Sequence, residues 1–114
     1  MIGILGKIIV FLNFITLIQC DGGLYTNNKY IYELNEDNFA DVINSNYTSI
    51  VKFYAPWCKY CREFESVFKK SSKLMSNHIQ FAAVNCDESK NKQLCANYRV
   101  EGYPTILSFR PPKY

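Results

Sequence analysis

The stretch from Ser49 to Ala55, SIVKFYA, restricts the possible folds of this chain more than any other segment. It is dense in β-branched and aromatic residues, which is typical of a strand covered on both faces. Directly after it the spacing of apolar residues changes, because Cys61, Phe64 and Phe68 recur every three or four positions, as on one face of a helix. A buried strand that runs into an amphipathic helix predicts a sheet with helices packed on it.

The same reasoning gives an alternating order of strands and helices along the rest of the chain. The expected elements are a strand over 30–34, a helix over 36–44, the strand over 49–55, a helix from 58 onward, a strand over 79–84, a helix over 90–98 and a strand over 105–109. Asn35 is the expected N-cap of the first helix, and Leu34 and Phe39 the expected hydrophobic staple across its start. The second and third strands, joined by a helical crossover, are expected to be parallel. The order predicts one α/β domain.

The first 20 residues differ in composition from the rest. Met1 to Cys20 carry a single charge, Lys7, and then an apolar run of about a dozen residues, which is too short for a membrane span and typical of a secretory signal peptide. An N-terminal anchor that is not cleaved is the alternative. We expect a signal peptide over 1–20, a flexible lead-in over 21–28 and one domain over 29–114.

Loss of residues 1–20 has consequences for charge and for cysteine pairing. The net charge falls from +3 to +2, which is too small to favour binding to nucleic acid. Four of the 5 cysteines remain, an even number that can pair in the oxidising secretory pathway.

Asn46 lies in the one N-x-S/T sequon, within the polar stretch NSNYTS, and is therefore a candidate glycosylation site on a surface loop.

Cys58 and Cys61 lie in the motif WCKYC, where the buried strand ends and the helix begins. The unpaired amides and the dipole at a helix start stabilise a thiolate at Cys58, whereas Cys61 lies one turn further in. We expect Cys58 to attack a disulfide and Cys61 to resolve the mixed disulfide that forms. A static crosslink is one alternative, although a loop this short stabilises little. A zinc site is another, but Cys86 and Cys95 form no second close pair and His78 is the single histidine.

Several motifs together resemble the catalytic domain of the protein disulfide isomerase family. They are VKFYAPWCKYC, the helix that follows it, and AAVNCDESKNKQLCANYRVEGYPTILSF, and the resemblance covers about residues 31–109. The chain looks most like small fungal members that share the NYTS, VNCD and FRPPK stretches. The resemblance implies the thioredoxin fold, a three-layer α/β/α arrangement with a mixed central sheet. It also implies thiol–disulfide exchange on folding proteins in the endoplasmic reticulum lumen.

The resemblance implies roles for further residues. Tyr103-Pro104 matches the cis-proline loop, which lies beside the active pair and offers backbone to the extended chain of a substrate. Trp57 matches the aromatic residue that flanks the nucleophile, a position compatible with packing in the core. Cys86 and Cys95 match a second, structural disulfide of several members, with a regulatory redox role as the alternative.

The resemblance also implies the partners. Unfolded or misbonded secretory proteins are the expected substrates, and glutathione or an upstream thiol oxidase is the expected electron partner of the Cys58–Cys61 pair. Neither a metal nor another cofactor is expected, nor nucleic acid, nor a membrane span after signal cleavage. The alternatives are a module that holds unfolded clients through Trp57 and Tyr103 with little turnover, and a truncated, inactive fragment.

Three features depart from the family pattern. Lys59-Tyr60 stands between the cysteines where Gly-His is common, so the redox potential is expected to differ. Lys52 stands where the family has a buried acid that accepts the proton of the resolving cysteine. Lys52 could take that proton itself if uncharged, or extend to solvent, but we expect slower resolution. The chain stops after FRPPKY, so the family's last strand and helix and a retrieval signal are expected to be missing.

Overall fold

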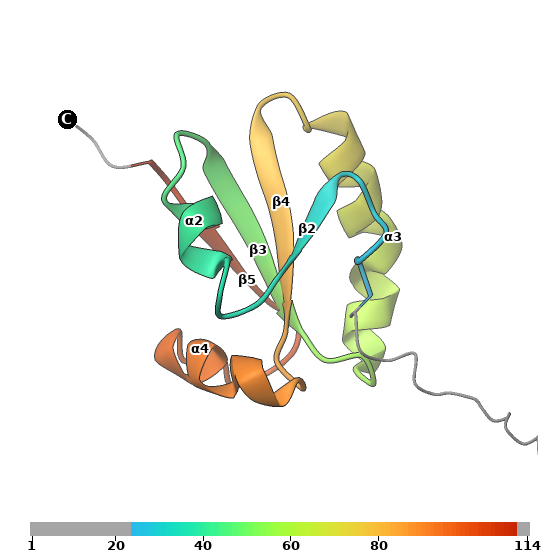
Figure 1. Cartoon of the computed structure of the whole chain (residues 1–114). Coiled ribbons are helices and arrows are strands. Elements are labelled where there is room, and N and C mark those ends of the chain that lie inside the picture. The colour runs from blue at the N-terminus through green and yellow to red at the C-terminus, as the bar shows by residue number, and fades with distance from the viewer. Residues whose placement is uncertain (1–23, 112–114) are drawn as a thin grey trace, which may run out of the picture.

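A four-stranded mixed sheet forms the centre of the molecule (Figure 1). The computed structural model describes residues 24–111, so the expected signal peptide over 1–20, residues 21–23 of the lead-in and residues 112–114 lie outside it. The strands are β2 (Ile31–Leu34), β3 (Thr48–Tyr54), β4 (Ile79–Asn85) and β5 (Thr105–Phe109). Their order is β2-β4-β3-β5, with β4 parallel to both β2 and β3 and β5 antiparallel to β3. The expected parallel pairing of the second and third strands is confirmed.

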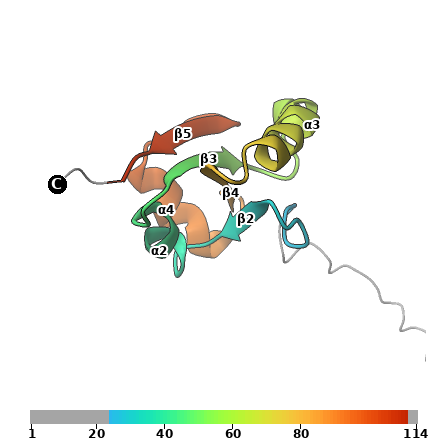
Figure 2. The ribbon, with the colours of Figure 1, turned by 90° about the horizontal axis from the view of Figure 1, so that it is seen from above.

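Helices cover both faces of this sheet (Figure 2). The helix α3 (Lys59–Leu74) packs on one face, and α2 (Phe39–Ile43) and α4 (Lys92–Asn97) pack on the other, the latter preceded by a short 3-10 turn, η1 (Ser89–Asn91). Each face has its own core cluster, because β-strand side chains alternate between the two sides. The three-layer architecture is the predicted one. No helix within residues 24–111 is long and apolar enough to cross a membrane.

The helix α2 begins later than the sequence predicts. The side chain of Asn35 accepts hydrogen bonds from the backbone N–H groups of Asp37 (2.8 Å) and Asn38 (3.2 Å), and Asn38 Oδ1 accepts one from the Asn35 N–H (2.8 Å). These bonds close a turn in place of the expected first helical turn, since Asn side chains compete with helical hydrogen bonds. Leu34 and Phe39 are nonetheless both buried, so the expected staple contact survives.

The described part of the lead-in, residues 24–28, is not the flexible segment that the sequence predicts. Tyr25 is only 1% exposed, and its ring makes edge contacts with Tyr54 (centroids 5.6 Å apart) and Phe68 (6.0 Å). It therefore belongs to the core cluster beneath α3. The surrounding Gly and Asn residues are typical of a loop, but this one aromatic side chain anchors the segment to the domain.

Candidate active site

The start of α3 places the two cysteines of WCKYC. Cys58 is the N-cap of this helix, with extended backbone, and its Sγ accepts a hydrogen bond from the Cys61 N–H at 3.1 Å. A negative charge on this sulfur therefore meets one of the free amides of the first turn. Both cysteines are free thiols, Cys58 being 5% exposed and Cys61 fully buried.

The loop before β5 lies against the same sulfur. The Tyr103–Pro104 peptide bond is cis, and the Tyr103 carbonyl oxygen accepts the Cys58 thiol at 3.5 Å. The Trp57 ring meets the Tyr103 ring edge-on, with centroids 5.7 Å apart. Trp57 itself is 63% exposed, so the alternative of simple packing in the core is excluded. Cys58, Trp57 and the cis-proline loop thus come together from two distant parts of the chain.

The two residues between the cysteines face solvent. Lys59 is exposed, and so is Tyr60. Trp57 and Tyr60 stand close to Cys58 in the sequence, and the half-buried Tyr103 contacts the Cys58 sulfur through its carbonyl oxygen; we call these three residues the aromatic rim. Exposed aromatic surface of this kind is typical of a site that binds another protein.

The Cys61 thiol is harder to ionise than a cysteine exposed to water. Burial is the main cause that raises the pKa of its thiol to about 11; the hydrogen bond with Cys58 acts in the same direction, while the charge of Lys52 opposes the shift. A resolving attack by Cys61 therefore needs a group that takes up the thiol proton.

Lys52 lies beneath the two cysteines with its side chain fully buried. Its Nζ donates to the Tyr25 hydroxyl at 2.6 Å and to the Cys61 carbonyl oxygen at 3.3 Å. The possibility that Lys52 extends to solvent is thus excluded. Burial lowers its pKa, and the nearby Cys61 and Glu65 oppose that shift. Four aromatic rings have centroids 5.2–5.8 Å from Nζ, those of Tyr25, Tyr54, Phe64 and Phe68.

Glu33, a half-buried residue that was not among the candidates predicted from the sequence, bonds to the same group of side chains. Its Oε1 accepts the Tyr25 N–H at 3.0 Å and its Oε2 accepts the Tyr54 hydroxyl at 2.8 Å. Burial raises the pKa of this carboxyl to about 7, and the Tyr54 hydroxyl and Lys52 oppose the shift. The signal that could have found it is strand alternation, since Glu33 stands in phase with the buried Ile31 in YIYEL.

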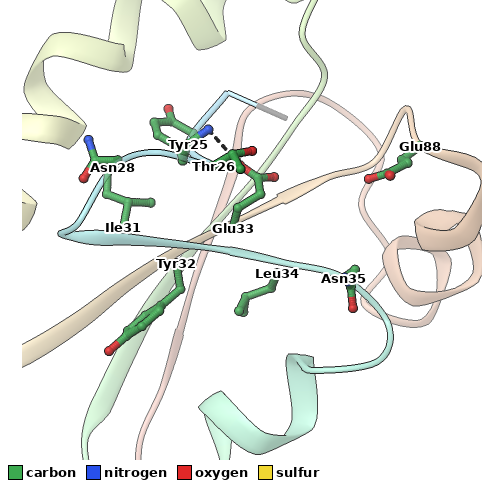
Figure 3. Close-up of a pocket in the computed structure, with 9 residues that line it drawn as sticks. All are labelled: Tyr25, Thr26, Asn28, Ile31, Tyr32, Glu33, Leu34, Asn35 and Glu88. Carbon is green, nitrogen blue, oxygen red and sulfur yellow. Dashed lines mark hydrogen bonds between the residues drawn. The ribbon is translucent and has the colours of Figure 1, made fainter. Parts of the chain in front are cut away.

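Glu33 also lines a cavity of about 380 Å³ at the edge strand β2 (Figure 3). Figure 3 shows Tyr25 and Glu33 on one side of the β2 ribbon, with Tyr32 and Leu34 on the other. Glu88, which follows β4, stands at the same cavity. Of the buried group around Lys52, Glu33 and Tyr25 therefore border this cavity.

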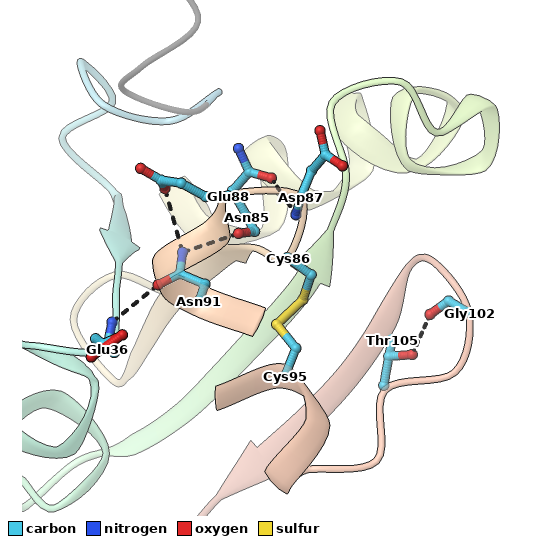
Figure 4. The surroundings of a disulfide bond; sticks show 9 residues. All are labelled: Glu36, Asn85, Cys86, Asp87, Glu88, Asn91, Cys95, Gly102 and Thr105. Carbon is cyan, nitrogen blue, oxygen red and sulfur yellow. Dashed lines mark hydrogen bonds between the residues drawn. A yellow bond between two sulfur atoms is a disulfide. The ribbon is translucent and has the colours of Figure 1, made fainter. Parts of the chain in front are cut away.

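The other cysteine pair forms a disulfide on the opposite face of the sheet (Figure 4). Cys86 and Cys95 have Cα atoms 6.0 Å apart and tie the end of β4 to α4. Next to them, the Asn91 side chain donates to the Asn85 carbonyl (3.0 Å) and accepts from the Glu36 N–H (3.1 Å). The bond lies in the core cluster that contains α4, apart from the free thiols.

The remaining expectations concern glycosylation and metal binding. Asn46 is exposed in the connection between α2 and β3. Among residues 24–111 there is no group of three or more His, Cys, Asp or Glu side chains that could hold a metal ion.

Comparisons with known proteins agree with this arrangement. The Thioredoxin family model matches residues 30–113. The protein disulfide-isomerase MPD1 of Saccharomyces cerevisiae is 51% identical over 90 residues, which cover 78% of this chain and 28% of that protein. A protein disulfide-isomerase of Hordeum vulgare is 39% identical over 83 residues, which cover 70% of this chain and 16% of that protein. The chain thus spans about a quarter or less of these relatives.

Solved structures show the same fold. The J-Trx1 fragment of ERdj5 superposes with a TM-score of 0.70 at 27% identity, over 79% of this chain and 44% of the fragment. The zinc-bound form of human ERp44 gives a TM-score of 0.64 at 29% identity, over 70% of this chain and 24% of that one. The chain therefore belongs to the thioredoxin family, and its sequence is similar to those of protein disulfide isomerases.

Proposed function

We propose that this protein is a thiol–disulfide oxidoreductase, a protein disulfide isomerase that acts on folding secretory proteins. The observation that carries the proposal is the environment of the Cys58 sulfur. Cys58 is a free thiol at the start of a helix, and its sulfur accepts a hydrogen bond from the Cys61 N–H at 3.1 Å. The same sulfur lies beside the Tyr103 carbonyl oxygen of the cis-proline loop. The similarity to protein disulfide isomerases supports it.

The chemistry proceeds in two exchanges. The Cys58 thiolate attacks one sulfur of a client disulfide, so that a Cys58–client bond forms and the second client sulfur leaves as a thiolate. The Cys61 thiolate then attacks Cys58 Sγ, forms the Cys58–Cys61 disulfide and releases the first client sulfur. The client is reduced by two electrons and the pair is oxidised; the reverse sequence oxidises a client dithiol. Glutathione or a thiol oxidase returns the pair to its starting state, with no metal or other cofactor.

The aromatic rim supports a polypeptide substrate. Trp57 and Tyr60 are 63% and 67% exposed, and they stand one and two residues from Cys58 in the sequence. Exposed aromatic side chains bind apolar segments, which unfolded proteins present and folded ones bury.

Three features of the chain support an action in the endoplasmic reticulum lumen. The N-terminal sequence favours a cleaved signal peptide, the Cys86–Cys95 disulfide suits an oxidising compartment, and the exposed Asn46 is the site we propose for a glycan.

Thiol trapping in glutathione buffers tests the activity. The protein is equilibrated at graded ratios of reduced to oxidised glutathione, acid-quenched, alkylated and analysed by mass spectrometry. We expect the Cys58–Cys61 pair to pass from dithiol to disulfide within this range, and the protein to reshuffle a misbonded model client. Absence of a Cys58–Cys61 disulfide at every ratio would contradict the proposal.

The exposed rim also favours a second function, the holding of unfolded clients without turnover. A Cys58→Ser/Cys61→Ser double variant separates the two. If it suppresses aggregation of a reduced client as well as the parent does, and the parent shows no reshuffling, the protein is a binding module. If reshuffling occurs and is lost in the variant, it is an enzyme.

A further inference from the structure

We propose that Glu33 is the carboxylate that accepts the Cys61 proton in this chain, with the ammonium group of Lys52 held between the two. The inference rests on the thiol–disulfide exchange proposed above and adds a residue to its resolving step. Four observations carry it: the sheet register, the hydrogen bonds, the balance of buried charge and the cavity.

The register of the sheet places Glu33 and Lys52 in one row. Ala83 of β4 pairs with Glu33 of β2 on one side and with Lys52 of β3 on the other. Residues in one row of a sheet point to the same face. Both side chains therefore lie on the α3 face, and the buried methyl group of Ala83 is too small to separate them.

Two tyrosines fix the positions of the carboxylate and the amine. The Tyr54 hydroxyl and the Tyr25 backbone N–H both donate hydrogen bonds to the Glu33 carboxylate. The Tyr25 hydroxyl accepts a hydrogen bond from Lys52. Lys52 in turn donates to the Cys61 carbonyl oxygen, so the group reaches the resolving residue. Each polar atom named here has a partner, as a buried polar group requires.

The balance of charge favours this assignment. Before resolution the buried group holds the Lys52 ammonium and the Glu33 carboxylate, with no net charge. Cys61–SH and Glu33–COO⁻ then become Cys61–S⁻ and Glu33–COOH, while Lys52 is protonated at the start and at the end. The negative charge has moved from one side of the ammonium to the other, and the group is still neutral. This avoids an unpaired charge in the core, which is costly.

The proton that Glu33 takes up has a way out. The thiolate of Cys61 attacks Cys58 Sγ, the bond to the client breaks, and the client sulfur leaves as a thiolate that solvent protonates. Glu33 then releases its proton to water in the cavity of about 380 Å³ that it lines. Cys61 and Lys52 are both fully buried and have no such exit of their own.

The surroundings suit Glu33 to this task at neutral pH. Burial brings the pKa of its carboxyl to about 7, where a base is most effective near physiological pH. The titratable groups that face it are Tyr25 from the lead-in, Lys52 and Tyr54 from β3, and Glu88 after β4. Cys61 and Glu65 of α3 lie beyond, within charge range of Lys52.

The test compares Glu33→Gln with Glu88→Gln, a change at the same cavity. The amide introduced by Glu33→Gln can keep a hydrogen bond to each tyrosine partner but cannot take up a proton. The measured quantity is the single-turnover rate at which a peptide is released from its mixed disulfide with Cys58, between about pH 5.5 and 8.5.

In the parent protein, we expect the release rate to rise with pH through about 7. In Glu33→Gln this inflection disappears, and release at pH 8 is about tenfold slower, less than the effect of a base in direct contact with the thiol. Glu88→Gln keeps the inflection, at slightly lower pH because its charge raises the pKa of Glu33.

An unchanged pH profile in Glu33→Gln overturns the inference. Formation of the mixed disulfide by Cys58 is measured separately in Cys61→Ser; if the parent chemistry is absent, that variant traps no peptide, and the failure belongs to the proposed function. A second measurement needs no variant at this site: carbon NMR of the Glu33 carboxyl in the reduced protein. Titration near pH 7 is expected, and titration near 4.5 overturns the inference.

Discussion

Cys58 and Cys61 carry the same side chain and differ in what surrounds the sulfur. The Cys58 Sγ receives a helix amide and lies against the Tyr103 carbonyl, at the aromatic rim. The Cys61 thiol is fully buried, and burial raises its pKa to about 11. We therefore expect Cys58 to attack a client disulfide and Cys61 to resolve the mixed disulfide.

This division predicts the outcome of single cysteine variants. Cys61→Ser should accumulate clients as mixed disulfides through Cys58, because the resolving thiol is gone, and Cys58→Ser should accumulate none. Non-reducing gels and mass spectrometry of the captured species measure both. Equal capture by the two variants would show that the roles are assigned wrongly.

The buried carboxyl of Glu33 predicts a dependence of stability on pH. Its pKa is raised from 4.5 to about 7 in the folded protein, so the folded state binds more protons than the unfolded state between these values. The stabilisation of the folded state that comes from protonated Glu33 is therefore complete below about pH 4.5, and it is lost as the pH rises through about 7. Relative to Glu33→Gln, the parent should lose stability between about pH 5 and 7 in urea titrations, and a constant difference would contradict this.

At the scale of elements, α4 depends on bonds that reach outside it. It has 6 residues and no side-chain cap, and a helix this short is marginal by itself. Cys95 ties it to the end of β4 through the disulfide, and Asn91 bonds to the Asn85 carbonyl at 3.0 Å. In addition to its packing in the core, α4 is therefore held by these bonds to the end of β4.

Removal of that disulfide should lower stability without touching the active pair. Cys86→Ala/Cys95→Ala is expected to cost about 2–3 kcal/mol of unfolding free energy, because the bond closes a short loop in the unfolded chain. In the parent, Cys86–Cys95 should stay bonded in the glutathione buffers that cycle Cys58–Cys61. Finding both cysteines as free thiols in protein from the secretory pathway would remove the structural interpretation.

At the scale of the whole molecule, the sheet separates two cores, and the segment before β2 completes one of them. Tyr25 packs between Tyr54 of the sheet and Phe68 of α3, and its hydroxyl takes a hydrogen bond from Lys52. The domain therefore begins earlier than residue 29, the boundary expected from sequence.

Two substitutions at Tyr25 separate packing from hydrogen bonding. Tyr25→Ala should cost about 3–5 kcal/mol, as for other large aromatic side chains in cores. Tyr25→Phe keeps the ring but removes the shorter of the two hydrogen bonds that Lys52 donates, and should cost about 1–3 kcal/mol. Tyr32→Ala is the control, since Tyr32 is 54% exposed on β2, and it should cost less than either. Urea titrations measure all three; a loss in Tyr25→Ala no larger than in the control would mean that the segment does not support the core.

The sequence was sufficient to predict the order of elements, the parallel pairing and the placement of Cys58 at a helix start, because these follow from local periodicity and one motif. Tyr25 and Glu33 were missed for a physical reason. Both contribute through contacts with distant segments, and their neighbours in the sequence are typical of a loop and of an edge strand. Alternation gives the face of the sheet on which Lys52 lies, but not the rings that enclose it, which come from three different segments.

The cavity at β2 lies apart from the aromatic rim, and this separation affects how client binding and proton release depend on each other. None of the residues that line the cavity belongs to the aromatic rim, so the rim and the cavity are two separate sites on the described part of the molecule. In the reaction proposed above, a polypeptide client docks at the rim, where the disulfide exchange takes place, and water reaches Glu33 through the cavity. We therefore expect a bulky client to cover the rim and leave the cavity open, so that client size affects capture but not the rate at which Glu33 releases its proton.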